Sequence, residues 1–544
     1  MSSLVLAEKV RLLDGEAAEW GLNPFALVEA AGRACAAVLV KAFPRFFVRH
    51  PAGSRPAAKA PKITVLAGSG NNAADSLVML RALLLDGRAD LTNALVLVSR
   101  LPAAGGETPL SEALLAIQKM GVSVRAWDRE EAALSGADII IDGIAGTGLQ
   151  GPLRGKALEM AEAVNRLRED PPVDGSPGRP LVVSIDVPSG NFDEWRPGMP
   201  LLAADATLAI EPQKRCLYTP AVRSRAGRIL SVGGIFPPAL IEKYRDAERL
   251  SWRDAARRLP EIWADTYKYE RGLVEIRAGA TGTAGAARLA ARGAQAAGAG
   301  LVRLIVDDSL YPILAPAATG IMVAPGGASP GGTSGRFQPD AVLLGPGWGR
   351  GQDRAALLEQ CLPLEEQGVP LILDADAVYL AKGLTFHGRA ILTPHAGEFA
   401  AYTGLPKEEI LAGPAPVLRR FAKEKNAHIL FKSHVLYAAA PDGRLGIIDG
   451  MAPVLAAGGS GDVLAGICAA LAARLRAAGK QRAFDGYVCA CAAAALLMEA
   501  ARSPETAGRF IDPSDLACAA SSIAGKAWLP ADLTNNTNKD DTII

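Results

Sequence analysis

The stretch Gly458-Gly459-Ser460-Gly461-Asp462, followed at once by Val463-Leu464-Ala465-Gly466-Ile467, decides the fold assigned to the second half of this chain. Small residues let backbone N–H groups converge on an anion, and the apolar run from Val463 to Ala477 predicts a helix whose positive end faces the same point. A carboxylate there repels a phosphate, but it can take a proton from a hydroxyl that is about to meet a phosphoryl group. The stretch predicts chemistry between a nucleotide phosphate and a substrate hydroxyl; the alternative is a glycine-rich turn before a buried helix.

Length and composition limit the classes of protein to which this chain can belong. With 544 residues it is too long for one core, and 49% apolar with 21% charged residues is typical of well-buried globular domains. A net charge of +1 argues against nucleic acid or an anionic membrane as a partner. The seven cysteines lack paired spacing, and the early charges of the N-terminal segment argue against a secretory signal. The longest apolar run, Tyr487 to Met498, is a buried helix too short for the ~20 residues that span a bilayer. We therefore expect a cytoplasmic protein with a small-molecule partner.

Strands and helices alternate along two blocks, which predicts two α/β domains whose ligands bind at the carboxyl ends of parallel strands. The first domain covers residues 1–236, a charged helical linker covers 237–265, the second domain covers 266–530, and a disordered tail covers 531–544. The predicted strands are 63–67, 94–99, 137–142, 181–186 and 206–210 in the first domain, and 273–276, 301–306, 341–344, 370–373, 390–392 and 429–431 in the second. The predicted helices include 24–43, one from about Ser76, 156–168, 285–297 and 463–477.

Three polar motifs follow strands of the first domain. Asn71, Asn72 and Asp75 come after the strand 63–67, in a turn whose oxygens suit a monovalent or alkaline-earth cation, or a ribose or phosphate held by backbone N–H groups. Asp142 and Asp186 each end a strand beside glycines. One such aspartate is typical of a turn or a helix cap, but three of them at the ends of strands indicate a shared site.

These motifs, in this order, resemble the NAD(P)HX epimerase domain of the NAD(P)H-hydrate repair enzymes over about residues 10–236; Ala204–Thr207 and Lys214 resemble its later strand. The resemblance implies a Rossmann-like three-layer domain and a K⁺ ion held by Asn72, Asp142 and Ser189. It also implies that Asp186 exchanges the proton in interconverting the two epimers. The residues it implies for binding the hydrated nucleotide are Asn71, Asn72, Asp75, Gly146, Thr147, Gly148 and Asp186.

The second domain carries five motifs in a fixed order, and the order is more specific than any one of them. They are Gly345–Gly349, Asp374–Ala377, Thr393–Glu398, Lys432 and Gly458–Asp462. The order resembles the ADP- or ATP-dependent NAD(P)HX dehydratase domain, which has a ribokinase-like α/β fold, from about Tyr267 to Leu529. An epimerase-like half followed by this domain is the arrangement of the bifunctional enzyme.

The resemblance assigns roles to residues of the second domain. Asp462 would take the proton from the 6-hydroxyl of the hydrated nicotinamide, and phosphorylation would turn a poor leaving group, hydroxide, into phosphate. Asp374 and Asp376 can equally be caps or turn formers. The expected cofactors are ADP or ATP, K⁺ and Mg²⁺, and a homo-oligomer is expected. The residues implied for the nucleotide are Lys432, Gly458, Gly459, Ser460 and Gly461, and those for the hydrated substrate are Gly347, His395 and Asp462.

The chain departs from the family at several positions, which leaves two alternatives open. Ala73, Ala74 and Ser76 stand where glycines are usual, and each added Cβ costs about 1 kcal/mol if positive φ is required there. The first half could therefore be a binding domain without catalysis. The second half could be a ribokinase-like small-molecule kinase with the same base. We prefer the bifunctional repair enzyme, since a kinase lacks both the first domain and the Thr393–Glu398 element.

Overall fold

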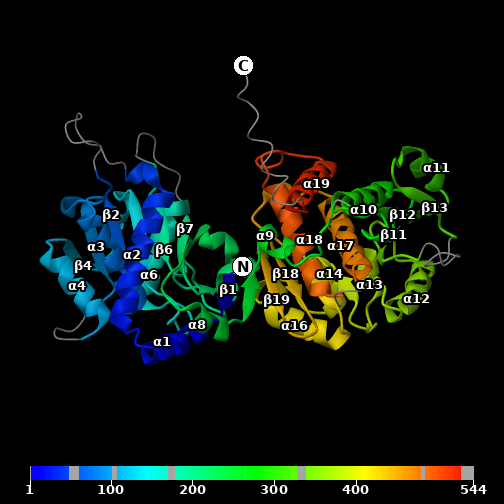
Figure 1. Ribbon diagram of the computed structural model, residues 1–544. Helices are drawn as coiled ribbons and strands as arrows, with labels where there is room; N and C mark the ends of the chain where they lie inside the picture. Colours follow the sequence, from blue (N-terminus) through cyan, green and yellow to red (C-terminus); the bar gives the residue numbers. More distant parts are fainter. Residues whose placement is uncertain are drawn as a thin grey trace, which may run out of the picture. The chain divides into compact units, whose positions relative to one another are not determined.

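The computed structural model describes residues 2–47, 60–100, 107–169, 178–263, 265–327, 338–479 and 484–528. The chain forms two compact units, and the division falls between Ala247 and Glu248 (Figure 1). This position lies inside the segment 237–265 expected to be a linker, while the expected tail 531–544 lies outside the described residues. Each unit has the predicted α/β fold class.

A sheet of seven parallel strands forms the middle of the N-terminal unit, in the order β4-β3-β2-β5-β6-β7-β9. Strands β2, β5, β6 and β7 are buried along their whole length, as apolar runs covered on both faces require. The five predicted strands are confirmed to within two residues. The strands are β2 (Ile63–Ala67), β3 (Ala94–Val98), β4 (Ser123–Ala126), β5 (Ile139–Gly143), β6 (Leu181–Ile185), β7 (Ala206–Ile210) and β9 (Arg228–Val232). Outside this sheet, β1 (Ser2–Val5) and β8 (Gln213–Lys214) pair in parallel.

Helices cover both faces of this sheet, which gives the predicted Rossmann-like three-layer arrangement (Figure 1). Neighbouring strand residues alternate between the two faces: Val65 packs with α2, α3 and α4, whereas Leu66 packs with α5 and α6. The helices are α1 (Val10–Glu19), α2 (Pro24–Ala42), α3 (Asn71–Leu85), α4 (Pro109–Lys119), α5 (Glu131–Ser135), α6 (Gly155–Glu169), α7 (Pro220–Arg223) and α8 (Pro238–Lys243).

Helix α3 begins five residues before the predicted start near Ser76. The extended residue Gly70 is its N-cap, and the Gly70 carbonyl accepts hydrogen bonds from the backbone N–H groups of Ala73 and Ala74 at 3.1 and 3.3 Å. The expected asparagine-rich turn is therefore wrong, because these residues form the first turns of a helix. Ala73, Ala74 and Ser76 lie outside the positive-φ region, so their Cβ atoms cause no backbone strain, and alanine favours a helix over glycine.

The C-terminal unit contains a mixed sheet in the order β13-β12-β11-β14-β15-β16-β17-β18-β19-β10. The strands from β13 to β17 are parallel, β17-β18-β19 are antiparallel, and β10 lies parallel to β19. The six predicted strands are confirmed. The strands are β10 (Ala247–Arg249), β11 (Leu273–Arg277), β12 (Leu301–Val306), β13 (Met322–Pro325), β14 (Ala341–Leu344), β15 (Leu371–Leu373), β16 (Ala390–Leu392), β17 (His428–Phe431), β18 (Val435–Ala439) and β19 (Leu445–Asp449).

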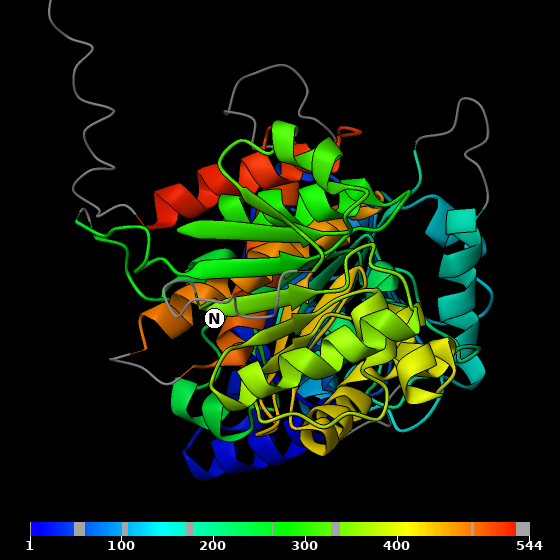
Figure 2. The ribbon, with the colours of Figure 1, turned by 90° about the vertical axis from the view of Figure 1, so that its right-hand side faces the viewer.

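Two groups of helices lie on opposite faces of this sheet (Figure 2). An alanine-rich core joins α10, α17, α18 and α19 to one face, and the predicted buried helix at 487–498 is α18. The other face carries α12, α13, α14 and α16. The helices are α9 (Trp252–Ala256), α10 (Ala284–Ala296), α11 (Tyr311–Leu314), α12 (Gln352–Glu366), α13 (Asp376–Leu380), α14 (Ala396–Thr403), α15 (Lys407–Ala412), α16 (Pro414–Lys425), α17 (Ser460–Ala477), α18 (Gly486–Ala501) and α19 (Pro513–Trp528). No helix among the described residues is long and apolar enough to cross a membrane.

Helices α10 and α17 approach each other so closely that each needs a glycine at the contact. A Cβ atom on Gly466 would lie 1.9 Å from the carbonyl oxygen of Ala290, and one on Gly293 would lie 2.3 Å from that of Val463. No side chain can be inserted at that spacing without moving a backbone. The contact therefore fixes α17, and with it the residues at its N-terminus.

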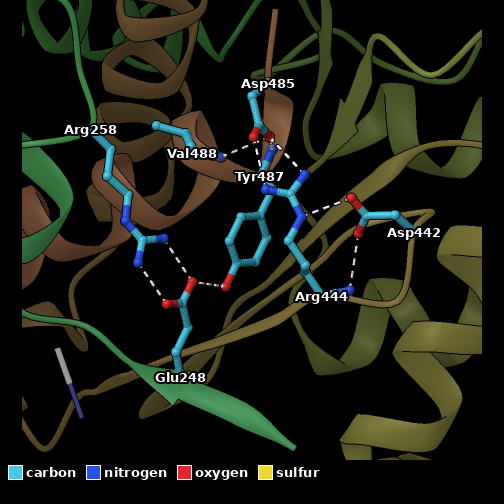
Figure 3. A network of polar contacts seen from close by, with 7 residues as sticks. All are labelled: Glu248, Arg258, Asp442, Arg444, Asp485, Tyr487 and Val488. Carbon is cyan, nitrogen blue, oxygen red and sulfur yellow. Dashed lines mark hydrogen bonds and ion pairs between the residues drawn. The ribbon is translucent and has the colours of Figure 1, made fainter. Parts of the chain in front are cut away.

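The segment expected to be a helical linker contains two short helices, α8 and α9, and also a strand, β10. Glu248 of β10 pairs with Gly446 of β19 and is 6% exposed. Its carboxylate accepts hydrogen bonds from the hydroxyl of Tyr487 at 2.5 Å and from both terminal nitrogens of Arg258 at 2.7 and 2.6 Å (Figure 3). The expectation of helix fails here because a neutralised glutamate can be buried in a sheet.

Candidate active sites

The N-terminus of α17 has no side-chain cap. Gly459 is the N-cap, with φ of +99°. The helix begins at Ser460, three residues before the predicted start, so Asp462 lies within the first turn. The Ser460 hydroxyl donates to the Leu455 carbonyl at 2.9 Å. The result is the predicted pairing of helix-terminal amides with an adjacent carboxylate.

An ion pair between a partly buried lysine and a buried aspartate lies beside this turn. The Nζ atom of Lys432 is 2.5 Å from Oδ1 of Asp374, a residue that is 2% exposed. The Thr393 hydroxyl donates to the same oxygen at 2.6 Å. A Cβ atom on Gly461 would lie 3.5 Å from Lys432 Nζ, which places the ammonium against the first turn of α17. Asp374 is thus a counter-charge rather than a turn former.

His395 and Glu398 extend this polar cluster. The Nδ1 atom of His395 accepts from the backbone N–H groups of Gly397 and Glu398 at 3.0 and 3.1 Å, so His395 caps α14. Glu398 returns the contact by accepting from the His395 N–H at 2.8 Å, and it lies 4.0 Å from Lys432 Nζ. The imidazole is more than half exposed. Because Nδ1 is occupied by these helix amides, Nε2 remains for a ligand or for Oε1 of Glu398, which lies 3.3 Å away.

The pKa of Asp462 is raised to about 6 by burial and then by the charge of Asp374, while Lys432 acts in the opposite direction. Burial alone would lower the pKa of Lys432, but Asp374 and Glu398 outweigh it, and the pKa is raised. The cluster therefore contains a stable cation next to a carboxylate that can exchange a proton near neutral pH. This combination suits a general base beside a bound phosphate.

The Gly345–Gly349 loop lies next to Asp374 and Asp376. A Cβ atom on Gly345 would lie 1.9 Å from the Asp374 carbonyl oxygen. Gly347 has φ of +58°, and its carbonyl accepts from the Thr283 hydroxyl at 2.6 Å. Asp376 accepts from the Gly349 N–H at 2.9 Å. The loop is thus held between Thr283, which directly precedes α10, and the Asp374–Ala377 motif.

In the N-terminal unit, Asp186 follows β6 with φ of +64°, an uncommon conformation for a residue other than glycine. Its Oδ1 atom lies 2.5 Å from Nζ of Lys214, which is 2% exposed and also donates to the Ile210 carbonyl at 3.0 Å. Burial raises the pKa of Asp186, although Lys214 opposes the shift. A strained, ion-paired carboxylate at the end of a parallel strand is a candidate for proton transfer.

Two of the three residues expected to hold K⁺ are in direct contact. Asp142 is fully buried; one oxygen accepts from the Ser189 hydroxyl at 2.5 Å, and the other accepts from the Ser189 N–H at 3.0 Å. The Ser184 hydroxyl and the Ile144 N–H also donate to this carboxylate, at 2.7 and 3.2 Å. Burial raises the pKa of Asp142, and the hydrogen bonds offset part of the shift.

The third expected ligand, Asn72, lies beside the Gly146–Gly148 loop. A Cβ atom on Gly146 would lie 3.2 Å from Asn72 Oδ1. Asn72 is 8% exposed, and its Nδ2 atom has no hydrogen-bond partner in the described part of the chain. Asp75 is equally buried, and its Oδ1 also has no such partner among those residues. Asn71, by contrast, is exposed. Buried amide and carboxylate groups without partners indicate that a polar ligand belongs here.

Asp14 of α1 is a member of the site that sequence reasoning missed. Its pKa is raised to about 6 by burial, with the charges of Lys214 and Asp186 acting on it in opposite directions. No motif marks this residue, because it lies on an amphipathic helix and not at the carboxyl end of a strand of the seven-stranded sheet. The resemblance gives Lys214 only a place in a later strand, and its ion pair with Asp186 depends on the fold.

The architecture and the two clusters define the class of protein: a two-domain α/β enzyme with a separate polar site in each half. Residues 274–521 match the family model for NAD(P)H-hydrate dehydratase, and residues 24–216 match that for the YjeF-related protein N-terminus. The bifunctional NAD(P)H-hydrate repair enzyme of Moorella thermoacetica is 30% identical over 509 residues, or 89% of this chain and 91% of the relative. That of Gloeobacter violaceus is 33% identical over 495 residues, or 87% and 89%.

The chain belongs to the family of bifunctional NAD(P)H-hydrate repair enzymes. The predicted function is thereby confirmed: an epimerase half precedes an ADP- or ATP-dependent dehydratase half. Among solved structures, the ADP/ATP-dependent NAD(P)H-hydrate dehydratase from Bacillus subtilis co-crystallized with ATP/Mg²⁺ has 25% identity and a TM-score of 0.45, over 52% of this chain and 98% of that chain.

Proposed function

We propose that Asp462 is the general base of the dehydratase half. The observation that carries this proposal is its place in the uncapped first turn of α17, beside the Lys432–Asp374 ion pair. Asp462 takes the proton of the 6-hydroxyl, and the resulting oxygen attacks the terminal phosphorus of the nucleotide. The bond to the bridging oxygen breaks, and the shorter nucleotide leaves. The lone pair of N1 then expels phosphate from C6, and loss of a proton from C5 to solvent forms the C5=C6 double bond of the reduced nicotinamide.

The remaining residues of this site bind and orient. The N–H groups of the Gly458–Gly461 turn hold the transferred phosphate at the positive end of α17, and Lys432 neutralises its charge. His395 and Gly347 contact the hydrated dinucleotide. Mg²⁺ would be held by the phosphates of the bound nucleotide and would neutralise part of their charge.

In the epimerase half, Asp186 exchanges the proton of the reacting hydroxyl or water. The hydrated nicotinamide lies against the Gly146–Gly148 loop and the first turns of α3, which carry Asn71, Asn72 and Asp75. Support comes from the buried groups without partners on α3 and from the strained conformation of Asp186. Both features mark a place where the fold is built around a ligand.

A K⁺ ion is held by Asn72, Asp142 and Ser189 in this half. Asp142 is a fully buried carboxylate, and no cationic side chain lies within 4 Å of it among the described residues. Hard oxygen donors around such a carboxylate suit K⁺, which supplies the missing positive charge. The protein works in the cytoplasm, where its seven free cysteines stay reduced. The expected homo-oligomer is tested by light scattering.

One assay tests the whole proposal. Hydrated NADH is incubated with the full-length protein and ADP, ATP or neither, and NADH absorbance and inorganic phosphate are followed. Recovery of absorbance with equal release of phosphate supports the dehydratase. A stable phosphorylated product identifies the kinase alternative. Asp186→Asn tests the first half: if the epimers interconvert no faster with the wild-type protein than with this variant, the N-terminal half only binds.

A further inference from the structure

Asp186 is the carboxylate of a buried cluster that has a cation in direct contact with it. Lys214 contacts it at 2.5 Å and is itself anchored on the Ile210 carbonyl. Lys214 comes from β8 and Asp186 from the end of β6, so the pair joins two elements. A buried ammonium at this distance favours the charged form of the Asp186 carboxylate. Its effect on a carboxyl group farther away is weaker.

Asp75 is the opposite case. It lies on α3, is 8% exposed, and its Oδ1 atom has no hydrogen-bond partner in the described part of the chain. Burial and then the charge of Asp186 raise its pKa well above the ordinary value, and Asp14 adds to the shift while Lys214 opposes it. Three carboxyl groups therefore lie near one ammonium. Among the described residues neither Asp75 nor Asp14 forms an ion pair with it, and Asp75 is the more deeply buried of the two, so its surroundings favour the protonated carboxyl.

The other titratable groups near this cluster do not change that assignment. Cys35 of α2 interacts electrostatically with Asp75, Asp186 and Lys214. Burial raises the pKa of its thiol, so the thiol stays neutral. Burial likewise raises the pKa of the Cys216 thiol, whose charged neighbours are Asp193, Asp186, Lys214 and Arg215. Neutral thiols add no charge that could ionise Asp75 or neutralise Asp186.

We propose that Asp75 and Asp186 are the acid and the base of epimerisation, and that Lys214 is a positioning residue that holds Asp186 ionised. The proposal rests on the proposed epimerase site and adds a second proton-transfer group to it. Epimerisation at C6 needs one group to protonate the departing hydroxyl and another to deprotonate the arriving water. Two carboxyls with opposite protonation, on different elements, meet that requirement.

The step balances without any further reactant. Asp75 gives its proton to the 6-hydroxyl, the C6–O bond breaks, and water leaves while the lone pair of N1 forms a C=N bond. A second water attacks C6 from the other face, and Asp186 takes its proton. Solvent returns the proton from Asp186 to Asp75. In the reverse direction the two residues exchange roles.

The experiment uses the full chain without nucleotide, so that dehydration cannot run and only the ratio of the two epimers changes. Chromatography follows the interconversion of hydrated NADH across pH for the wild type, Asp75→Asn, Asp75→Glu and Lys214→Met. Asp205→Asn is the matched control, because Asp205 is a structural carboxylate that binds Arg168 and Arg179 at 2.8 and 3.0 Å.

We expect Asp75→Asn to lower kcat about 100-fold or more with little change in KM, and to remove the alkaline limb of the pH profile. Asp75→Glu should recover part of both. Lys214→Met should move the acid limb to higher pH, because Asp186 loses its counter-charge. Asp205→Asn should lower the melting temperature and leave the profile in place. In heavy-oxygen water, the epimerised fraction should carry labelled oxygen.

Two results would overturn the proposal: an alkaline limb that survives in Asp75→Asn, or an acid limb that does not move in Lys214→Met. The second variant keeps the test decisive if the first is unstable. Failure of the epimerase assignment itself looks different, since the wild-type protein would then leave the epimers at their spontaneous rate of interconversion at every pH.

Discussion

The Nζ atom of Lys432 lies 2.5 Å from Oδ1 of Asp374, and a side chain added to Gly461 would begin 3.5 Å from the same ammonium. This places a buried ion pair directly against the turn proposed to hold the transferred phosphate. The ammonium has its own counter-charge, so it need not pair with Asp462. Asp462 thereby stays available as a base, and Asp374 raises its pKa.

We predict that Asp374→Asn moves the acid limb of the dehydratase pH profile to lower pH. Asp462 loses a repelling charge, and Lys432 is freed to interact with it; both effects lower the pKa of Asp462. Activity at pH 7 should fall as well, because Lys432 is no longer held in place. Steady-state rates between pH 5 and 8 provide the measurement.

Asp376→Asn is the matched control for Asp374→Asn. Asp376 lies two residues away, but its oxygens bind the Gly349 N–H and the Arg350 guanidinium, at 2.9 and 2.8 Å. It should change KM without moving the acid limb. An equal displacement of the limb in both variants would show that the electrostatic role of Asp374 is wrong.

The dehydratase should gain activity as pH rises through about 6, the raised pKa of Asp462. A base must be ionised, so the folded-state pKa sets the lower edge of the active range. Asp462→Asn should lower kcat about 100-fold or more and abolish this limb. Nucleotide binding, measured by calorimetry, should be retained because the amides of the turn stay in place. Full turnover in Asp462→Asn would remove the residue from the mechanism.

Much of the fold could be predicted from the sequence. Continuous apolar runs such as Ile139–Ile141 are typical of strands covered on both faces, and this run forms the buried strand β5. The strand at Glu248 could not be predicted, because its burial depends on Arg258 and on Tyr487, which lies more than two hundred residues away. Sequence patterns report local periodicity and not a distant counter-charge.

The sites show the same division. Motifs located Asp186, Asp142 and Asp462 at the ends of strands or helices. They could not show which carboxylate has a cation beside it, since Lys214 and Lys432 are distant in the sequence from their partners and only the folded sheets bring them together. Ala73 and Ala74 lie in the first turns of α3, which begins five residues before the predicted start, and in a helix these residues need no positive φ.

We predict that K⁺ stabilises the N-terminal half more than Na⁺ does. Asp142 is a fully buried carboxylate held by hydrogen bonds, and a bound cation would add the opposite charge that the folded state lacks. The melting temperature of the full-length protein should rise with K⁺ concentration, and so should epimerase activity. Asp142→Asn should remove the dependence on the cation. Equal melting in both salts would count against the site.

The contact between α10 and α17 predicts a large effect of one methyl group. In Gly466→Ala, the new Cβ would lie 1.9 Å from the Ala290 carbonyl oxygen, so the helices must separate, at a cost of about 1–3 kcal/mol or more. Because α17 carries Asp462 at its N-terminus, dehydratase activity should fall with stability. Gly525→Ala is the control. Gly525 lies in α19, a Cβ atom there would meet no heavy atom within 4 Å outside its own helix backbone, and the variant should stabilise the folded protein by about 0.4–1 kcal/mol. Chemical denaturation measures both variants, and a Gly466→Ala protein as stable as Gly525→Ala would contradict the close packing on which the position of Asp462 depends.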